Sequence, residues 1–387
     1  MSEYIYARVV SIAPMFASDG KKTYEVVELP DDISEGDWCK FTKNDGIIRY
    51  HEKDTPSDTP FPGREWRKFQ TPGTDGRTRM DALKFRSEVL SGTRKFFTDS
   101  GYFEVETPLV VSSPGVETHL NAVNVSGNKF LSPSPEFQMK RLLAGGSGSI
   151  FQITKCFRQD ETGKHHNPEF TMIEWYHVGA DAETLRCDVE DLVDFLIEYT
   201  GNPGKIKKPP YKRMTMKEAF LEYASVDDYN RSPKELFKMA GINSSPPEKW
   251  EDAFFQVFVE KVEPHLSDNG PCFLTHWPKE FASLSRLDEN DSEVAERFEF
   301  FSNGLEIANG FHELTDYKIQ TSRSLGELEE RKISGKPLYP LDNLFLESLK
   351  EGMPDTAGIA LGMDRLVMLL WGTDDISNVL SFNADEL

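Results

Sequence analysis

The chain has 387 residues and a formal net charge of −21, which results from 65 acidic and 44 basic residues. This length allows two or three domains and a large buried core. The negative balance excludes a surface built mainly to grip a phosphate backbone, because that binding depends on Lys and Arg displacing counterions. Only a confined basic patch remains compatible with this charge.

The cysteines and the first residues indicate the cellular compartment in which the protein is expected. Four cysteines lie far apart without a C-x-x-C pair, which argues against a zinc ribbon, a redox dithiol or a disulfide scaffold; they are Cys39, Cys156, Cys187 and Cys272. The start, MSEYIYARVV, has no basic segment followed by an apolar one, and no stretch approaches the roughly 20 apolar residues of a membrane span. We therefore expect reduced thiols and a cytoplasmic protein.

Residues 1–52 are expected to form a small β-rich domain. Their strand-like segments are YIYARVVSIA, TYEVVEL and KFTKNDGIIRYH, and the last is interrupted by a turn at Asn44-Asp45-Gly46. Residues 53–77 then concentrate Pro, Gly, Asp and Thr without periodicity, as a linker does. A second domain is expected to cover residues 78–387.

Two helices of the second domain are predicted by periodicity. One begins near Leu83 and ends before Gly101, and the other runs from Ala182 to Thr200 with Asp181 as its cap. The first presents Leu83, Val89, Leu90, Phe96 and Phe97 on one face, and the second Leu185, Val189, Leu192, Val193 and Leu196. Between them, FEVETPLVV is typical of a strand. The second helix is expected to be structural.

The section RFEFFSNGLEIANGF predicts a β-hairpin. Asn303-Gly304 is a strong signal for a two-residue type I′ turn. A two-residue loop pairs Ser302 with Leu305, and the next pair along the hairpin follows from that register.

This register brings two acidic residues together. Phe301 pairs with Glu306, and period-2 alternation places Glu299 on the same face as Phe301. The two carboxylates repel each other unless a cation lies between them, and a hard dication such as Mg²⁺ prefers oxygen ligands. Taken alone, the pair is more often a solvated strand face than a metal site.

Residues 157–176, FRQDETGKHHNPEFTMIEWY, combine cations with aromatic residues. Arg158 offers a planar fork suited to phosphate oxygens, and Lys164, His165 and His166 add further donors. A basic surface loop would explain these charges equally well. The chain has no Walker-type or G-x-G-x-x-G segment, so a nucleotide would be held by side chains on a sheet.

The same stretch resembles motif 2 of the class II aminoacyl-tRNA synthetases. The matching residues are Phe157–Asp160 and Asn167–Thr171, while ETPLVV resembles motif 1 and GIALGMDRLVML resembles motif 3. Within class II the chain is most similar to the lysyl branch, and there to the elongation factor P lysine ligases. The shared stretches are SPEFQMKRLL, VAERFEFFSNGLEIANGFHELTD and EGMPDTAGIALGMDRLVMLLWG.

The resemblance covers residues 83–387 and implies the fold and the reaction. The expected fold is α+β, with an antiparallel sheet flanked by helices and a homodimer formed through motif 1. The implied enzyme activates lysine or β-lysine with ATP and Mg²⁺ as an aminoacyl-adenylate and transfers it to a lysine of elongation factor P. The N-terminal domain is too short for a complete anticodon-binding barrel, so tRNA is not expected as a partner.

Alternatives remain open at this point. One is a truncated lysyl-tRNA synthetase relative that aminoacylates tRNA or another acceptor. Another is a non-catalytic amino-acid-binding paralogue, although loss of Arg158, Glu306 or Arg365 would have been its signature and all three are present. The choice between α-lysine, β-lysine and a related diamino acid depends on pocket shape, which motifs do not resolve.

The resemblance also implies roles for individual residues. Arg158 and Arg365 are the catalytic residues: Arg158 holds the α-phosphate, Phe170 stacks on adenine and Arg365 covers its other face. Further ATP contacts are implied for Asp160, His166, Asn167, Glu306, Ile307 and Gly362. Glu299 and Glu306 are implied as metal ligands, in agreement with the hairpin argument. The amino-acid pocket is implied at Ser134, Pro135, Glu136, Tyr176, Asn309, Glu313 and Ala360.

Two positions depart from the lysyl-tRNA synthetase pattern. Asp160 stands where the family usually has Glu, so the adenine contact is weaker or is made by Glu161. Ala360 stands where lysyl-tRNA synthetases usually have Gly, and the extra methyl changes the shape of a close-packed pocket. Residues expected to be structural or on the surface are His119, His276, His312, Met172 and Trp175.

Overall fold

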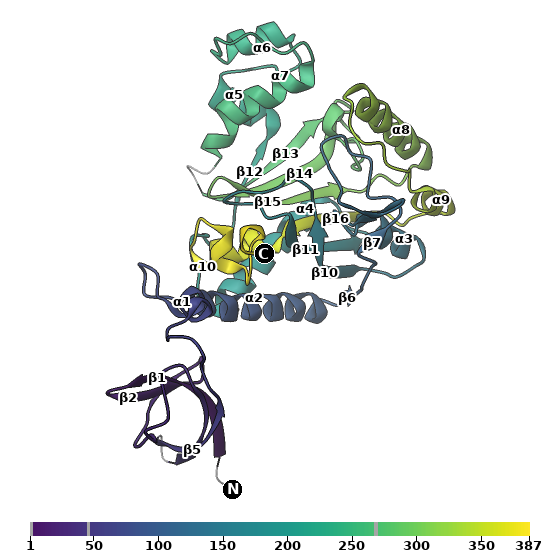
Figure 1. Ribbon diagram of the computed structural model, residues 1–387. Helices are drawn as coiled ribbons and strands as arrows, with labels where there is room; N and C mark the ends of the chain where they lie inside the picture. The colour runs from purple at the N-terminus through teal and green to yellow at the C-terminus, as the bar shows by residue number, and fades with distance from the viewer. Residues whose placement is uncertain (1–2, 45–46, 267–269) are drawn as a thin grey trace. The chain divides into compact units, whose positions relative to one another are not determined.

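The computed structural model describes residues 3–44, 47–266 and 270–387, and the chain divides into two compact units, Met1–Ala82 and Leu83–Leu387 (Figure 1). No helix in the described part of the chain is both long and apolar enough to cross a membrane.

The first unit is a five-stranded sheet in the order β3-β2-β1-β4-β5. The strands are β1 (Glu3–Ile12), β2 (Met15–Ser18), β3 (Thr23–Glu25), β4 (Trp38–Asn44) and β5 (Ile47–Thr55). A parallel bridge between Val26 and Ile48 joins the two edges, so the sheet closes around a small core that includes Val9 and Phe41. The predicted turn at Asn44-Asp45-Gly46 falls at Asp45 and Gly46, outside the described residues.

The stretch 53–77, expected to be a linker, contains regular structure. Strand β5 continues to Thr55, and a helix, α1, spans Arg64–Gln70. Its sequence REWRKFQ consists largely of good helix formers, but Pro and Gly on both sides dominate the composition of the whole stretch.

The second unit is built on an eight-stranded sheet in the order β12-β13-β14-β15-β16-β11-β10-β6. From β13 to β10 the neighbours are antiparallel, and only the outermost pairs are parallel. The strands are β6 (Phe103–Glu104), β10 (Ile150–Phe157), β11 (Glu169–Val178), β12 (Lys212–Thr215), β13 (Cys272–Pro278), β14 (Val294–Ser302), β15 (Leu305–His312) and β16 (Thr356–Gly362). A small second sheet contains β7 (Val110–Val111), β8 (Asn124–Ser126) and β9 (Lys129–Leu131).

The predicted strand FEVETPLVV is therefore two short strands. Pro108 lies between β6 and β7, and proline cannot donate to a strand ladder.

The helices of this unit include both that were predicted. They are α2 (Arg79–Asp99), α3 (Glu136–Ala144), α4 (Ala182–Thr200), α5 (Met216–Ala224), α6 (Pro233–Met239), α7 (Trp250–Val257), α8 (Tyr317–Ile333), α9 (Asn343–Glu351) and α10 (Met363–Trp371). Asp181 caps α4 by accepting from the Thr184 amide at 2.8 Å, and Gly201 ends it in the left-handed region with φ 65°. Helices α5 to α7 gather at the β12 and β13 end of the sheet (Figure 1).

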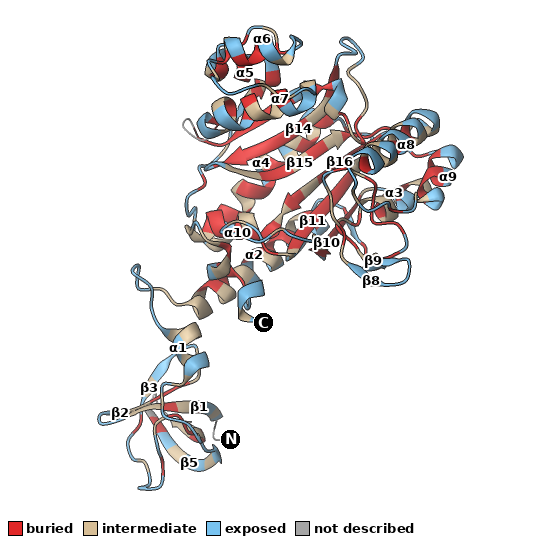
Figure 2. Ribbon diagram, turned by 45° about the horizontal axis from the view of Figure 1, so that its top comes forward, coloured by how far each residue is buried: buried red, intermediate tan, exposed pale blue. Residues whose placement is uncertain are grey.

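One face of the large sheet packs on the main core. Residues of α2, α4 and α10 contribute to this core together with Trp175, Phe298 and Ile359 from the strands. Figure 2 shows buried residues along the strands and exposed residues on the outer turns of α6, α8 and α9. Because strand residues alternate between faces, the neighbours of these core residues point to the opposite side.

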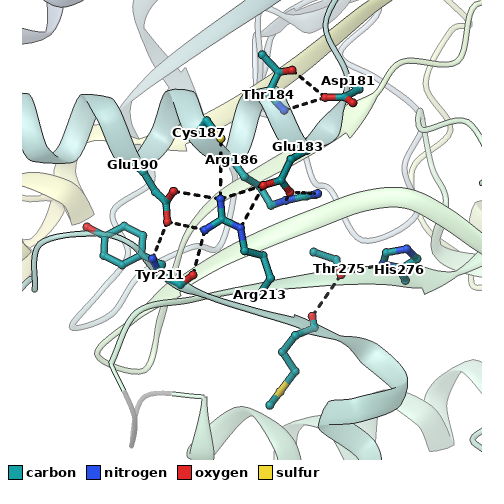
Figure 3. A network of polar contacts seen from close by, with 11 residues as sticks. Asp181, Glu183, Thr184, Arg186, Cys187, Glu190, Tyr211, Arg213, Thr275 and His276 are labelled. Atoms are coloured by element: carbon teal, nitrogen blue, oxygen red, sulfur yellow. Dashed lines mark hydrogen bonds and ion pairs between the residues drawn. The ribbon is translucent and has the colours of Figure 1, made fainter.

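An arginine joins the edge strand β12 to α4 (Figure 3). Arg213 donates to Glu190 at 2.6 and 3.0 Å and to Glu183 at 3.1 Å. Glu190 also accepts from the Tyr211 amide at 2.6 Å. The network fixes the helix that supports the sheet from behind.

The predicted hairpin is confirmed at its turn. Ser302 pairs with Leu305, and both turn residues have positive φ, 52° at Asn303 and 75° at Gly304, as a type I′ turn requires.

A β-bulge follows that was not predicted. Phe301 pairs with Glu306 as expected, but Phe300 pairs with Ala308, so Ile307 is the extra residue. An extra residue reverses the alternation beyond it. Ile307 and Ala308 therefore join the core, while Asn309 lies opposite Glu299.

Candidate active site

The face of the sheet opposite α4 borders a cavity of about 410 Å³. Its walls come from β11, β15, β16, α3, the loop 113–120 and the loop between β10 and β11. The predicted residues that line it are Ser134, Glu136, Arg158, His166, Asn167, Phe170, Tyr176, Glu306, Ile307, Asn309, Glu313, Ala360, Gly362 and Arg365. Three predicted residues are not among the lining: Pro135, Asp160 and Glu299.

A single row of paired residues crosses four strands of the sheet. Glu174 of β11 pairs with Ala360 of β16, Ala360 pairs with Asn309 of β15, and Asn309 pairs with Glu299 of β14. The row therefore runs from one buried carboxylate, past the Ala360 methyl, to a second carboxylate near the hairpin.

Arg158 lies at the end of β10, where it faces the cavity. Its guanidinium is 5.2 Å from the centre of the Phe170 ring and 3.5 Å from the Glu161 carboxylate. Its buried Nε has no hydrogen-bond partner among the described residues. An arginine held this way retains donors for an anion in the cavity.

Arg365 lies in the first turn of α10, on the other side of the cavity from Arg158. It donates to the Glu306 carbonyl at 2.6 Å, and its second amino group lies 2.7 Å from Nε2 of His166. Burial and the Arg365 charge lower the pKa of His166 below its ordinary value, which favours the neutral imidazole.

The residue before Arg365 fixes the start of α10. Asp364 is buried, forms an ion pair with Arg86 at 2.6 Å and accepts from the Thr171 amide at 2.8 Å. These contacts connect α2, β11 and α10, and so fix the first turn of α10, from which Arg365 projects.

Glu299 and Glu306 share one face of the hairpin, as predicted. Glu299 is 6% exposed, and burial together with repulsion from Glu306 raises its pKa to about 8 despite an ion pair with Arg297 at 2.5 Å. Two carboxylates under such repulsion fit a dication. Within the described residues no group of three or more His, Cys, Asp or Glu forms a metal cluster.

The amino-acid end of the cavity contains a buried lysine. Lys140 of α3 is 1% exposed, lies 2.6 Å from Glu136 and forms a second ion pair with Glu313. Burial opposes its charge, but the two carboxylates raise the pKa of Lys140 above its ordinary value. One ammonium thus serves two carboxylates, and a negative charge remains.

Glu313 has a buried carboxylate oxygen without a hydrogen-bond partner among the described residues. The residue is 1% exposed, and this oxygen is Oε1. Burial raises its pKa to about 7, and the nearby Glu136 adds to this while Lys140 opposes it. Gly358 makes room for this carboxylate, since a Cβ there would lie 2.3 Å from Oε1 and 2.4 Å from the Tyr176 ring.

The comparisons with known proteins agree with this geometry. The family model for class II tRNA synthetases (D, K and N) matches residues 75–386. Relatives named elongation factor P–(R)-β-lysine ligase occur in Salmonella arizonae, 37% identical over 314 residues, and in Klebsiella pneumoniae strain 342, 38% identical over 314 residues. Each match covers 78% of this chain and 94% of the relative. The chain belongs to the class II synthetase family, in the group of these ligases.

The family implies the use of ATP and a divalent metal, and the residues present fit both. Arg158 and Arg365 are two cations that border the cavity, and the carboxylates of Glu299 and Glu306 carry oxygen atoms of the kind that a divalent cation takes. An arrangement of cations and carboxylates around a cavity is suited to binding, orientation and charge stabilisation.

Sequence reasoning missed a carboxylate that lines the cavity. Glu174 is 2% exposed, accepts from Ser134 at 2.6 Å and from the Tyr176 hydroxyl at 3.1 Å. Burial and repulsion from Glu136 raise its pKa to about 8. The available signal was its position two residues before Tyr176, which puts both on the same face of a strand.

The remaining predicted positions differ in their surroundings. Asp160 is exposed at φ 66°, whereas Glu161 lines the cavity, in line with the alternative that Glu161 makes the nucleotide contact. Asn167 lines the cavity but also bonds the Glu169 carbonyl and the Ala384 amide. Met172, expected in the core, is buried and also borders the cavity.

Proposed function

We propose that this chain activates a lysine-type diamino acid with ATP and transfers it to a lysine side chain of elongation factor P. The observation that carries the proposal is the charge of the amino-acid end: Glu136, Glu174 and Glu313 are held together with one internal cation, Lys140. A substrate with two ammonium groups neutralises this excess, whereas an ordinary amino acid leaves one carboxylate buried without a partner.

In the activation step the amino-acid carboxylate attacks the α-phosphorus of ATP and pyrophosphate leaves. Arg158 binds the α-phosphate, Phe170 stacks on the adenine and Arg365 covers its other face. Negative charge grows on the phosphate oxygens in the transition state, so preorganised cationic donors stabilise it more than the ground state. The Glu299 and Glu306 pair would hold Mg²⁺, which supplies further neutralisation of phosphate charge when bound.

In the transfer step the acceptor amine attacks the carbonyl carbon of the aminoacyl-adenylate. The bond from that carbon to the phosphate oxygen breaks, AMP leaves with the electron pair, and the proton displaced from the attacking nitrogen passes to water. In this proposal the carbonyl lies between the two arginines and the pocket carboxylates, and orientation of the reactants supplies much of the catalysis.

The test is amino-acid-dependent ATP–pyrophosphate exchange by the purified chain with L-lysine, (R)-β-lysine and ornithine, followed by mass spectrometry of elongation factor P and a tRNA charging control. We expect exchange with a diamino acid and an aminoacyl mass increase on elongation factor P. Charged tRNA with unmodified elongation factor P would contradict the proposed acceptor, and no exchange with any of the three would contradict the activation step.

We further propose a homodimer formed around motif 1. Large apolar side chains are exposed on and near the motif, including Phe103 at 63% and Val110 at 48%. Leu344 of α9 is also 63% exposed and lines the same surface pocket as Pro108 and Val110. Light scattering after size exclusion should give twice the 44.0 kDa chain mass, and a monomer at micromolar concentration would refute it.

A further inference from the structure

The loop between β7 and β8 contributes a carboxylate that no part of the mechanism above uses. Glu117 is partly buried and lines the same cavity as Glu136 and Arg158. It makes no ion pair among the described residues. The neighbouring Gly115 has φ 99°, and a Cβ there would lie 2.5 Å from the Glu117 carboxylate, so the loop folds tightly against this side chain.

Helix α8 holds the main chain of this loop with a buried arginine. Arg331 is fully buried, donates to the carbonyls of Glu117, Leu120 and Pro337 at 2.8, 2.9 and 2.7 Å, and stacks 4.2 Å from the centre of the Tyr339 ring. Its described hydrogen bonds go to main-chain carbonyls. Its buried Nη2 has no hydrogen-bond partner among the described residues, so the charge is satisfied through Nε and Nη1, and displacing these carbonyls would leave further buried donors unpaired.

A second set of contacts fixes the next residue. Thr118 donates through its amide and its hydroxyl to the Glu327 carboxylate at 2.8 and 2.6 Å. Lys336 donates to the Thr118 carbonyl at 2.8 Å. The position of Glu117 is therefore determined from both sides, which is the preorganisation that a binding residue needs.

The surroundings of the carboxylate identify what it can bind. Burial and repulsion from Glu136 raise the pKa of Glu117 to about 7, with a smaller attraction from Arg158. The same cavity holds the open, buried Oε1 of Glu313. Both observations point to a cationic ligand, and a group small enough to reach between carboxylates is a primary ammonium.

We propose that Glu117 binds a primary ammonium group of a substrate beside Glu136, with Arg331 as its positioning residue. The inference rests on the proposed function, in which two molecules bring such a group: the diamino acid and the acceptor lysine. Either source presents the same chemistry to the carboxylate.

The experiment compares the full chain with E117Q, E117D and the matched control E329Q, which alters an α8 carboxylate that is 60% exposed and pairs with Lys332. Calorimetry measures the Kd of L-lysine and (R)-β-lysine, exchange measures activation, and mass spectrometry of elongation factor P measures transfer. Loss of one charge-assisted hydrogen bond corresponds to an affinity loss of roughly 10- to 100-fold.

If the ammonium belongs to the amino acid, E117Q raises its Kd by that factor with the KM for ATP unchanged, and E117D recovers part of the loss. If it belongs to the acceptor, amino-acid binding and exchange stay at the wild-type level while the KM for elongation factor P rises. E117Q that binds and transfers like the wild type overturns the inference and leaves the proposed function intact.

Failure of the proposed function has a different signature. A wild-type chain without exchange contradicts that function, whereas calorimetry still tests Glu117 because it requires no turnover. If the wild type binds neither amino acid and modifies no acceptor, both proposals are wrong.

The positioning role has its own readout. R331K keeps the charge but loses the planar guanidinium that reaches three carbonyls. We therefore expect R331K to weaken binding of whichever substrate E117Q weakens, the amino acid or the acceptor, with the KM for ATP unchanged. A change in thermal stability without any change in the Kd of the amino acid or the KM of the acceptor would show that Arg331 is only structural.

Discussion

Glu299 and Glu306 show how burial changes the titration of a common residue type. On an open strand face they would be solvated, but Glu299 is 6% exposed and its pKa is raised to about 8 by burial and by Glu306. Repulsion of this kind is relieved by a dication.

Substitution of Glu306 tests this pair. Because charge stabilisation in the transition state is lost, we expect E306Q to lower the rate of pyrophosphate exchange by roughly 100-fold. We also expect chelation to abolish exchange by the wild type and added Mg²⁺ to restore it. The control is E347Q, whose exposed carboxylate pairs with Lys350 on α9. A metal role for Glu306 would be excluded if E306Q catalysed exchange at the wild-type rate and with the same dependence on Mg²⁺.

The pocket carboxylates predict a pH dependence of stability. The pKa values of Glu174 and Glu313 are raised to about 8 and about 7 from an ordinary 4.5. Between pH 4.5 and these values the folded chain binds more protons than the unfolded chain, so stability conferred by the neutral carboxyls falls as pH rises toward 8. A bound diamino acid pairs with the ionised carboxylates and reverses this loss.

We therefore expect saturating lysine to raise the melting temperature more at pH 8 than at pH 6, measured by differential scanning fluorimetry. Norleucine has a similar length without the second ammonium and serves as the control. An equal shift for lysine at both pH values would mean that these carboxyls do not ionise on binding.

The hairpin shows what can be predicted for an element and what cannot. Asn303-Gly304 specifies the turn, and the first two cross-strand pairs follow from it. The bulge at Ile307 depends on packing of Ile307 and Ala308 against the core, which local sequence does not encode. Its consequence is functional, because it turns Asn309 toward the site face.

Gly358 of strand β16 forms part of the wall of the amino-acid pocket. A Cβ at Gly358 would meet Glu313 at 2.3 Å and Tyr176 at 2.4 Å, so G358A must displace the pocket. We expect the KM for the amino acid to rise roughly 100-fold with little change in the KM for ATP. The control is G326A on α8, where an added Cβ meets nothing within 4 Å. An unchanged amino-acid KM in G358A would show that the pocket wall yields.

The whole molecule consists of two units with separate cores. The relatives match 78% of the chain and 94% of their own length, so about a fifth of the chain lies outside the shared part. We propose that the β-rich segment 1–52 helps to recognise the acceptor.

A truncated protein beginning at Arg77 tests this hypothesis. It retains α2 and the main core, so we expect pyrophosphate exchange within about twofold of the full chain, since no catalytic contact is removed. The KM for elongation factor P should rise at least about tenfold. Circular dichroism checks that the shorter chain folds, and an unchanged acceptor KM would rule out a recognition role.

The sequence by itself determined the two long helices and the hairpin turn, because these depend on short spacings and local periodicity. The class II core and the expected site positions came from the resemblance of the three motifs to the family. Only the tertiary structure decided the carboxylate excess around Lys140, the bulge that orients Asn309 and the clamp that holds Glu117. These features join α3, β11, β15 and α8, which are far apart in the chain. Their contacts and pKa shifts arise from burial, which a linear pattern does not contain.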